Sequence, residues 1–296
     1  MGAIHPARRV RPRRSMLYVP ASHARALAKA PTLPADAIIV DLEDAVLPSA
    51  KEEAREAAAA ALEGPGWGAK ERILRVNGLD TPWGAGDLAR AASIAKLDAV
   101  LVPKVESADA VRAVEQALGD AQEALGIMAM IETPLGVLEA PRIAAASERL
   151  VAFVVGTNDL EAATGARQVP GRAPMLYALS ACVLAARAHG LSVIDGVYGR
   201  LEDAEGLRAE CQQGRELGFD GKSLIHPKQI DSAHAAFGPD PEAVAAAERI
   251  IAGFEAARAR GDGVAVVDGK MVEALHAELA ARTVALARGI EALSDS

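Results

Sequence analysis

The chain has few of the residues on which small secreted proteins and nucleic-acid binders depend. Only two cysteines, Cys182 and Cys211, occur in 296 residues, so no disulfide framework is predicted and a reducing, cytoplasmic location is expected. Neither has a partner at metal-site spacing, and we interpret both as core residues. The 32 Lys and Arg residues are outnumbered by 40 Asp and Glu. The formal net charge of −8 therefore argues against a general affinity for nucleic acid.

Long apolar runs are missing as well. No run approaches the roughly 18–20 residues that a helix needs to cross a bilayer, so no membrane partner is expected. The first residues are rich in Arg and lack the apolar segment of a secretory signal. We expect residues 1–13 to form a disordered basic tail. Hydrophobic residues nevertheless make up 51% of the chain, which is enough for the core of one large α/β domain.

Short apolar runs recur along the chain and are typical of strands buried on both faces. They lie at residues 15–20, 37–42, 72–77, 99–104, 127–132, 151–156, 191–196 and 222–227. Segments of helical composition, such as 49–62 and 108–125, lie between them. This alternation predicts a (β/α)8 TIM barrel over residues 14–237. An open doubly wound sheet is the alternative, but no GxGxxG follows the first run.

The chain breaks after the eighth run, at Gly238-Pro239-Asp240-Pro241. Beyond the break we expect a helix over 242–261, a short apolar stretch over 264–272 and a final helix to about residue 293. Residues 238–296 are therefore predicted to form a small C-terminal helical extension. Such a piece could act as a lid on its own barrel mouth or on a neighbour's.

Charged or titratable residues follow seven of the eight predicted strands, at the end where α/β barrels carry their chemistry. They are Asp41, Glu43 and Asp44 after the second strand, then Arg75, Lys104, Glu132, Asp159, Asp195 and His226. Rim ion pairs and helix caps are the simpler explanation for any one of these residues taken alone. Seven such strand ends at one barrel mouth favour a functional site.

Glu132 and Asp159 end successive strands, and paired carboxylates are the hard oxygen ligands that Mg²⁺ prefers. Each could instead cap the helix that follows it. Arg75 could hold a substrate carboxylate or stabilise an enolate oxygen. Such a site suits an oxyacid or 2-oxoacid substrate whose carbon–carbon bond is made or broken next to a carbonyl. Spacing alone leaves a Mg²⁺-dependent phosphotransferase open.

Several motifs together resemble the citrate lyase beta-subunit-like family, which includes malyl-CoA and citramalyl-CoA lyases. They are RSMLYVPASHARALAKA (14–30), DAIIVDLEDAVLPSAKEEAR (36–55), RVNG (75–78), VLVPKVES (100–107), MIETPLG (130–136), GTNDL (156–160) and IHPKQI (225–230). The resemblance implies a (β/α)8 barrel that catalyses Mg²⁺-dependent retro-Claisen cleavage. Its substrate would be a 3-hydroxyacyl-CoA thioester of the malyl-CoA or citramalyl-CoA type.

The resemblance also implies roles for individual residues. Glu132 and Asp159 correspond to the Mg²⁺ ligands, and Arg75 to the anchor of the substrate carboxylate or carbonyl. Glu43 and Asp44 correspond to acceptors for water on the metal. In the first block, Arg25 and Lys29 are candidate partners for CoA phosphates, or else exposed helix charges.

The C-terminal segment departs from the family pattern. The family reads G-x-M-V/I-D-x-P there, and its Asp serves as acid/base in a neighbouring subunit's site. Here Glu273 takes the place of that Asp and the Pro is absent. The extra methylene would displace the carboxylate by roughly 1 Å or more, which can cost ~10²-fold in rate. Either the site is rebuilt around Glu273, or this chain has a different substrate or step.

Three hypotheses follow. The first is a Mg²⁺-dependent carbon–carbon lyase for a CoA thioester, assembled as a homo-oligomer such as a trimer or hexamer, with Glu273 managing the proton. The second is an acyl-CoA thioesterase that uses the same site. The third is a subunit of a citrate lyase complex whose acyl group arrives on a carrier protein. A purely structural role would leave the charged strand ends without a purpose.

Overall fold

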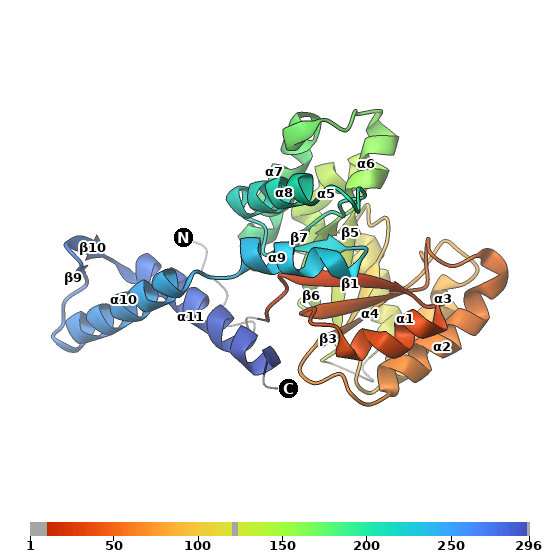
Figure 1. Cartoon of the computed structure of the whole chain (residues 1–296), viewed down its shortest axis with the longest axis horizontal. Helices are drawn as coiled ribbons and strands as arrows, with labels where there is room; N and C mark the ends of the chain where they lie inside the picture. Colours follow the sequence, from red (N-terminus) through yellow and green to blue (C-terminus); the bar gives the residue numbers. More distant parts are fainter. Residues whose placement is uncertain (1–10, 120–123, 295–296) are drawn as a thin grey trace. The chain divides into compact units, whose positions relative to one another are not determined.

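The computed structural model describes residues 11–119 and 124–294. The chain divides into two compact units, Arg13–Phe237 and Gly238–Ser296 (Figure 1). The basic tail expected over residues 1–13 lies largely outside the described residues, which exclude 1–10. No helix in the described part of the chain is both long and apolar enough to span a membrane.

The first unit is a closed barrel of eight parallel strands in chain order, which confirms the predicted (β/α)8 fold. The strands are β1 (Ser15–Pro20), β2 (Ala37–Asp41), β3 (Glu71–Arg75), β4 (Ala99–Val102), β5 (Gly126–Ile131), β6 (Leu150–Val155), β7 (Ser192–Asp195) and β8 (Gly221–Leu224). Pairing of β1 with β8 closes the ring. Most expected strands end one to three residues early, because their last residues belong to the loops at the barrel mouth.

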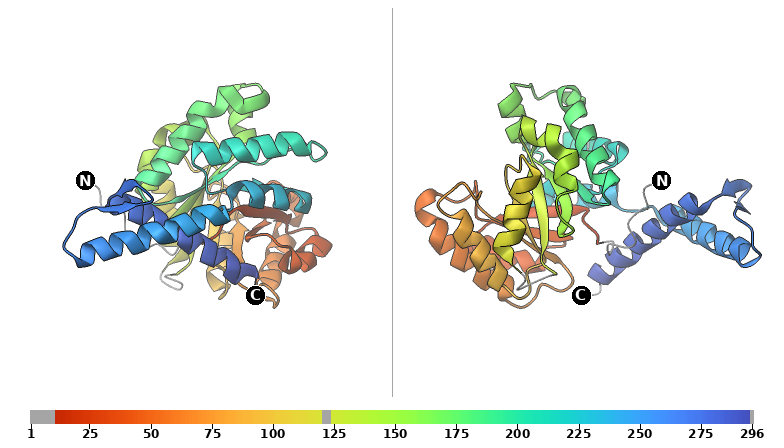
Figure 2. Two further views of the ribbon diagram at one scale, coloured as in Figure 1. Left: turned by 60° about the vertical axis from the view of Figure 1, so that its left-hand side comes forward. Right: turned by 180° about the vertical axis from the view of Figure 1, so that it is seen from behind.

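Helices connect successive strands and cover the outside of the barrel (Figure 2). They are α1 (Ala24–Lys29), α2 (Lys51–Glu63), α3 (Gly84–Ser93), α4 (Ala108–Leu118), α5 (Pro134–Ala144), α6 (Thr157–Thr164), α7 (Leu176–Ala188), α8 (Ala204–Leu217) and α9 (Ile230–Phe237). The helix expected over 108–125 ends earlier, because Gly119 leaves the helical conformation with φ 59°. Residues 120–123 of that expectation lie outside the described chain. Both cysteines are buried, as predicted.

Strand side chains alternate between two apolar layers. Met16, Ile39, Ile73 and Val154 belong to one cluster, which fills the barrel. Residues of opposite parity, such as Ile38, pack in a second cluster that includes residues of the surrounding helices. The same alternation turns Asp41 and Arg75, which end β2 and β3, and Glu132, which follows β5, toward the barrel axis. The carboxyl end of the barrel is thus a polar layer stacked on an apolar one.

The second unit is an α-hairpin with a small β-ribbon. It contains α10 (Pro241–Ala259), β9 (Ala265–Val267), β10 (Lys270–Val272) and α11 (Ala274–Ser294). The helices pack through Ala247, Ala280 and Val284. Asp268 and Gly269 both have positive φ, 51° and 74°, as the type I′ turn of a two-residue hairpin requires. The extension is thus helical as expected, but the apolar stretch predicted over 264–272 forms a hairpin.

Candidate active site

A cavity of about 350 Å³ opens at the carboxyl ends of the barrel strands. Its lining includes Tyr18, Arg75, Glu132 and Asp159, together with backbone and side chains at the start of α6. Three of the residues assigned from the sequence to substrate and metal therefore share one cavity. The walls are both apolar and polar, because Met130 and Val155 line the cavity together with the polar residues.

Arg75 ends β3 beside Asp41, the last residue of β2 and its partner in the strand register. The guanidinium donates from Nε to Asp41 Oδ1 at 2.6 Å and from Nη2 to Asp41 Oδ2 at 2.7 Å. It also pairs through Nη1 with Glu43 Oε2 at 2.8 Å and lies 4.9 Å from the ring centre of Tyr18. Burial acts to lower the pKa of Arg75, but the Asp41 carboxylate outweighs it and leaves that pKa raised.

The loop after β2 is held by side chains from both directions. Asp41 accepts from the backbone N–H groups of Glu43 and Ala45. Buried Lys51, from α2, donates to the carbonyls of Leu42 and Glu43 at 2.8 and 2.7 Å and to Asn77 Oδ1 at 2.7 Å. The DLED motif, the lysine ten residues after its first Asp and the asparagine of RVNG therefore form one network. It fixes Glu43 and Arg75 before any ligand is present.

Glu132 follows β5 and is 2% exposed. Its Oε1 accepts from the backbone N–H of Lys104 at 2.8 Å. Its Oε2 lies over Gly156, where an added Cβ would come within 2.5 Å of that oxygen. Burial, reinforced by the charge of Asp159, raises the pKa of Glu132 to about 7, against the lowering effect of the Lys104 N–H. The surroundings of Glu132 thus disfavour its ionised form, and a cation bound beside it would stabilise that form.

Asp159 lies in the first turn of α6, where the helix dipole favours a carboxylate. In the described part of the chain its side chain makes no hydrogen bond or ion pair. Neither it nor Glu132 serves as the capping residue left open above. Thr133 caps α5 through its hydroxyl, and α6 begins at Gly156 without a side-chain cap.

The charge around the cavity supports a cation between these two carboxylates. Carboxylates outnumber cationic groups there. The carboxylates are Asp41, Glu43, Asp44, Glu132 and Asp159, and the cationic groups are Arg75 and Lys104. Even with Lys51 added behind the loop, two negative charges stay unbalanced. Among residues 11–119 and 124–294, no group of three or more His, Cys, Asp or Glu could hold a metal. Mg²⁺ needs only one or two carboxylates, because water and substrate supply its other ligands. The residues present therefore fit that ion.

Glu43 and Asp44 occupy different positions. Glu43 is buried between Arg75 and Lys104, whose Nζ donates to its Oε1 at 2.9 Å. Asp44 lines the cavity, has a 60% exposed side chain and lies 3.6 Å from Arg75 Nη1. Asp44 is therefore open to water at the mouth, whereas both oxygens of Glu43 already have partners.

Asp195 does not face the mouth, and the expectation that seven strand ends present charge there is wrong at this position. Alternation in β7 turns Ile194 into the barrel and Asp195 outward. Its carboxylate is fully buried and pairs with Arg172 at 2.7 Å and Lys222 at 3.0 Å. Burial would raise the pKa of Asp195, but these two cations hold it below the ordinary value. This buried cluster joins β7 and β8 to the surrounding helices.

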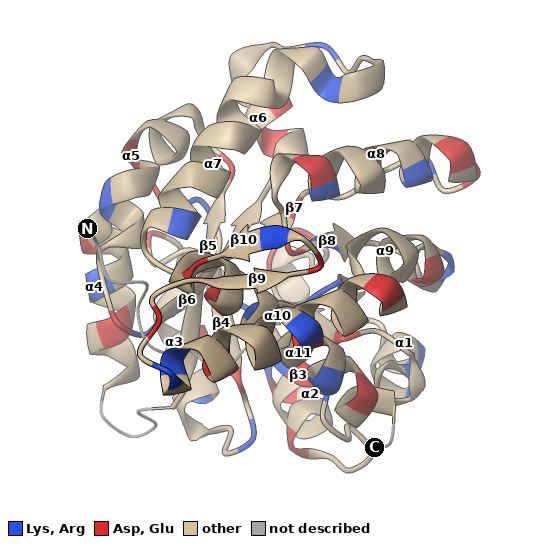
Figure 3. Cartoon of the chain, turned by 90° about the vertical axis from the view of Figure 1, so that its left-hand side faces the viewer, with Lys and Arg blue, Asp and Glu red and all other residues tan. Residues whose placement is uncertain are grey.

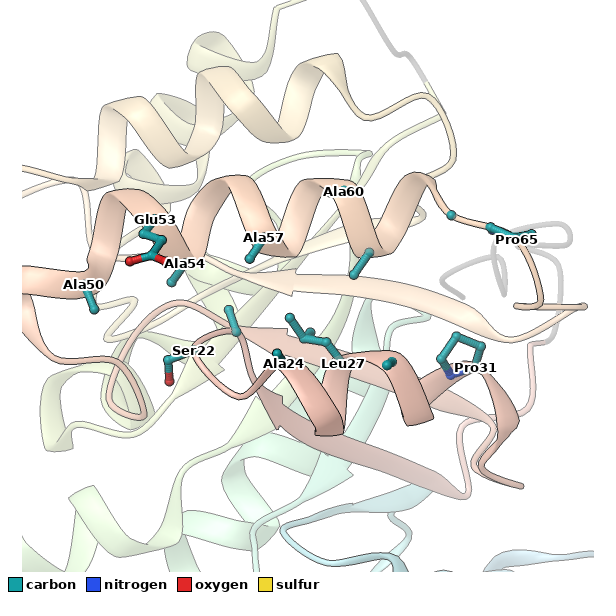
Figure 4. A pocket seen from close by; sticks show the side chains of 14 residues that line it. Ser22, Ala24, Leu27, Pro31, Ala50, Glu53, Ala54, Ala57, Ala60 and Pro65 are labelled. Atoms are coloured by element: carbon teal, nitrogen blue, oxygen red, sulfur yellow. The ribbon is translucent and has the colours of Figure 1, made fainter.

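The remaining assigned residues, Glu273 of the second unit and Arg25 and Lys29 of the barrel unit, are not among the residues that line this cavity. Glu273 is exposed between β10 and α11, and its backbone N–H donates to His276 Nδ1 at 3.0 Å. Arg25 and Lys29 are exposed on α1. That helix forms one wall of a second, apolar groove of about 560 Å³ between α1 and α2, lined largely by alanines (Figure 4). Their roles in catalysis and CoA binding stay predictions.

Sequence reasoning placed Asp41 among the charged strand ends but missed its role as the partner of Arg75, and it missed Tyr18 and Gly156 altogether. The alternation of side chains along a strand, with a period of two residues, could have indicated that Asp41 and Tyr18 face the inside of the barrel. Each continues an inward-facing apolar column, from Ile39 and Met16 respectively. The need for glycine at position 156 comes from its contact with Glu132, across two strands, and no local pattern reports it.

The comparisons with known proteins agree with this geometry. The family profile described as HpcH/HpaI aldolase/citrate lyase matches residues 14–227. The chain belongs to that family. This confirms the resemblance inferred from the motifs, and it points away from the phosphotransferase that spacing alone left open.

This HpcH/HpaI family member is similar in sequence to two curated relatives and in structure to one protein of known crystal structure. It is 51% identical over 290 residues to a (3S)-malyl-CoA thioesterase of Cereibacter sphaeroides, covering 98% of this chain and 100% of that protein. It is 38% identical over 273 residues to citrate lyase subunit beta of Escherichia coli, covering 90% of each. CitE of Mycobacterium tuberculosis, crystallised with magnesium, acetoacetate and coenzyme A, is 31% identical. It superposes with a TM-score of 0.70 over 94% of this chain and 97% of that one. The chain is thus a citrate lyase beta-like member of an enzyme family.

Proposed function

We propose that the chain is a Mg²⁺-dependent enzyme that hydrolyses a 3-hydroxyacyl-CoA thioester of the malyl-CoA type. The cavity carries the proposal, because it sets two carboxylates with unbalanced negative charge beside a fixed arginine. The 51% identity with a malyl-CoA thioesterase over the full length of that relative supports hydrolysis as the outcome. The magnesium and coenzyme A bound in the crystal structure of CitE from Mycobacterium tuberculosis support the ion and the thioester carrier.

The chain's own groups suit an anionic substrate. Arg75 has five N–H donors, of which three point to Asp41 and Glu43. Of the other two, one on Nη1 points to the weak acceptor Met130 Sδ at 3.9 Å, which a malyl carboxylate could displace, and one on Nη2 is available to that carboxylate directly. Glu132 and Asp159 would hold Mg²⁺, which when bound would supply positive charge to polarise the acyl oxygens. Arg25 and Lys29 make no ion pair in the described chain, so their charges are available to CoA phosphates.

Hydrolysis needs a positioned water as well. Asp44 is the exposed carboxylate of the cavity and can accept the proton of that water. The water oxygen bonds to the thioester carbon, the carbon–sulfur bond breaks, and the thiolate leaves as CoA after taking up a proton. The products are free CoA and malate.

Carbon–carbon cleavage, the leading hypothesis from the sequence, is the second candidate. The 38% identity with citrate lyase subunit beta favours it. In that reaction a base takes the proton of the hydroxyl, the bond between the hydroxyl-bearing carbon and the α-carbon breaks, glyoxylate leaves, and the enolate of acetyl-CoA takes a proton. Glu273 would deliver that proton. The Glu-for-Asp departure at this position is a reason to rank cleavage second.

Product analysis separates the candidates. The purified full chain is incubated with (3S)-malyl-CoA and MgCl₂, and free thiol, malate, glyoxylate and acetyl-CoA are measured. Hydrolysis gives equal amounts of free thiol and malate, whereas cleavage gives glyoxylate and acetyl-CoA without free thiol. EDTA should abolish either reaction, and added Mg²⁺ should restore it. No Mg²⁺-dependent turnover of malyl-CoA or citramalyl-CoA would contradict both, and would favour an acyl group delivered on a carrier protein.

A further inference from the structure

Lys104 adopts a backbone conformation that side-chain-bearing residues rarely use. Its φ is 49°, in the left-handed region. Within the described ranges, the other non-glycine residues with positive φ are Arg172 and Asp268, and Asp268 is explained by its hairpin turn. A strained residue of this kind persists where its surroundings over-determine it, often at a functional site.

The left-handed turn redirects Lys104 toward the mouth of the barrel. The alternation of β4 would place it on the face of Val100 and Val102, which belong to the outer apolar cluster. Instead, its backbone N–H donates to Glu132 Oε1 at 2.8 Å. Its Nζ donates to Glu43 Oε1 at 2.9 Å. Lys104 therefore contacts both Glu132, the candidate cation ligand, and Glu43, the partner of Arg75.

The two contacts act on different groups. The N–H occupies one oxygen of Glu132 and leaves the other, over Gly156, for a cation. The ammonium shares Glu43 with Arg75, whose Nη1 lies 2.8 Å from Glu43 Oε2. Without that ammonium, the buried Glu43 carboxylate would keep Arg75 and the backbone N–H of Asp44 as partners, both at Oε2, and the mouth would gain one net negative charge.

We propose that Lys104 is a positioning residue that sets the substrate-carboxylate site apart from the cation site. Its backbone orients Glu132 for the cation, and its ammonium neutralises Glu43 so that Arg75 keeps donors for an anionic substrate. This role rests on the function proposed above, and it extends the site to a residue that the strand pattern placed only at the rim.

Removing the ammonium alone should move the two binding steps in opposite directions. Lys104→Met retains the backbone N–H and most of the side-chain length. Binding of Mg²⁺ should be unchanged or up to about threefold tighter, because the mouth is more negative. Binding of a dicarboxylate should weaken by roughly three- to tenfold, a modest change because the ammonium is half-exposed. A residue with a merely structural role would weaken both steps together.

The test uses calorimetry on the full chain, with MgCl₂ alone and then with (S)-malate at saturating Mg²⁺. Lys104→Arg should restore malate binding, because it keeps the charge. Lys96→Met is the matched control, since it removes an exposed lysine in the loop before β4, and it should behave as wild type. Malate binding unchanged in Lys104→Met, or Mg²⁺ and malate binding weakened equally, would overturn the role of Lys104. A wild-type chain that binds no Mg²⁺ would instead overturn the proposed function.

Discussion

Arg75 and Asp41 form a two-point ion pair across neighbouring strands, with N–O distances of 2.6 and 2.7 Å. Both side chains are nearly buried, and their residues are opposite one another in the strand register. The guanidinium is therefore oriented before a substrate arrives, which is how a site lowers the entropy lost on binding. Glu132 and Asp159, which we propose hold the cation, line the same cavity as this pair.

Loss of Asp41 should destabilise the barrel strongly. Asp41→Ala leaves Arg75 buried with one carboxylate partner fewer and removes the acceptor for two N–H groups of the loop. We expect the free energy of unfolding to fall by about 3–5 kcal/mol, measured by urea denaturation. Asp109→Asn breaks an exposed pair on α4 and should change little. Equal effects of the two substitutions would contradict the importance of burial.

A methyl group at position 156 should disturb the cation site. In Gly156→Ala the new Cβ would lie 2.5 Å from both Cβ and Oε2 of Glu132, so the carboxylate must move. Mg²⁺ affinity should fall by at least about tenfold, measured by calorimetry on folded protein. Gly199→Ala is the matched control, because an added Cβ there meets nothing within 4 Å. If both variants bind Mg²⁺ like wild type, Glu132 is not a ligand.

Acid should weaken the barrel through Asp36. Burial alone would raise the pKa of this carboxyl, but hydrogen bonds from Arg14 and His234 hold it below the ordinary 3.8. Because the folded pKa is the lower one, Asp36 stabilises the fold fully above about pH 4 and loses that contribution as pH falls further. Urea midpoints should show wild type more stable than Asp36→Asn near neutral pH. The difference should shrink below about pH 4. A difference independent of pH would contradict this.

Glu273 should matter for carbon–carbon cleavage and not for stability. Its side chain is exposed, and its described hydrogen bonds use only its backbone N–H and carbonyl. If it carries the proton, Glu273→Ala should lower kcat by about 10²-fold or more while the urea midpoint stays unchanged. Glu278→Ala removes another exposed carboxylate of the same region, in α11. Equal kcat values for the two variants would remove Glu273 from the mechanism, and would be compatible with hydrolysis alone.

The barrel could be predicted because each strand is a short apolar run bounded by turn residues, and each connection has helical composition. The carboxyl ends of the strands were predicted too late in the chain, since polar residues such as Asn77 and Lys104 belong to the loops that follow. The 264–272 hairpin could have been found from its Asp268-Gly269 pair, the usual residues of a tight two-residue turn.

The site could be predicted only in part. Glu132 and Asp159, which line the cavity, could be picked out as candidates because Glu132 directly follows an apolar strand and Asp159 lies in the first turn of the helix after the next one. Which charged groups pair with one another depends on which face each strand end presents, and this separates Asp41, at the mouth, from Asp195, under the helices. Arg75 and its partner Asp41 come from different strands, and so do Glu132 and the glycine beside it, Gly156. Only the closed barrel brings them together. Acidic and basic residues are interspersed along the helices (Figure 3), so charge alone was no further guide.

The central claim is that Glu132 and Asp159 hold one divalent cation at the barrel mouth. Crystals of the full chain soaked with MnCl₂, measured at the manganese absorption edge, test it directly. We expect one anomalous peak in the cavity, about 2.0–2.3 Å from one oxygen of each carboxylate, which excess MgCl₂ removes. Carboxylates that point away from each other, with no peak between them at saturating Mn²⁺, would contradict it.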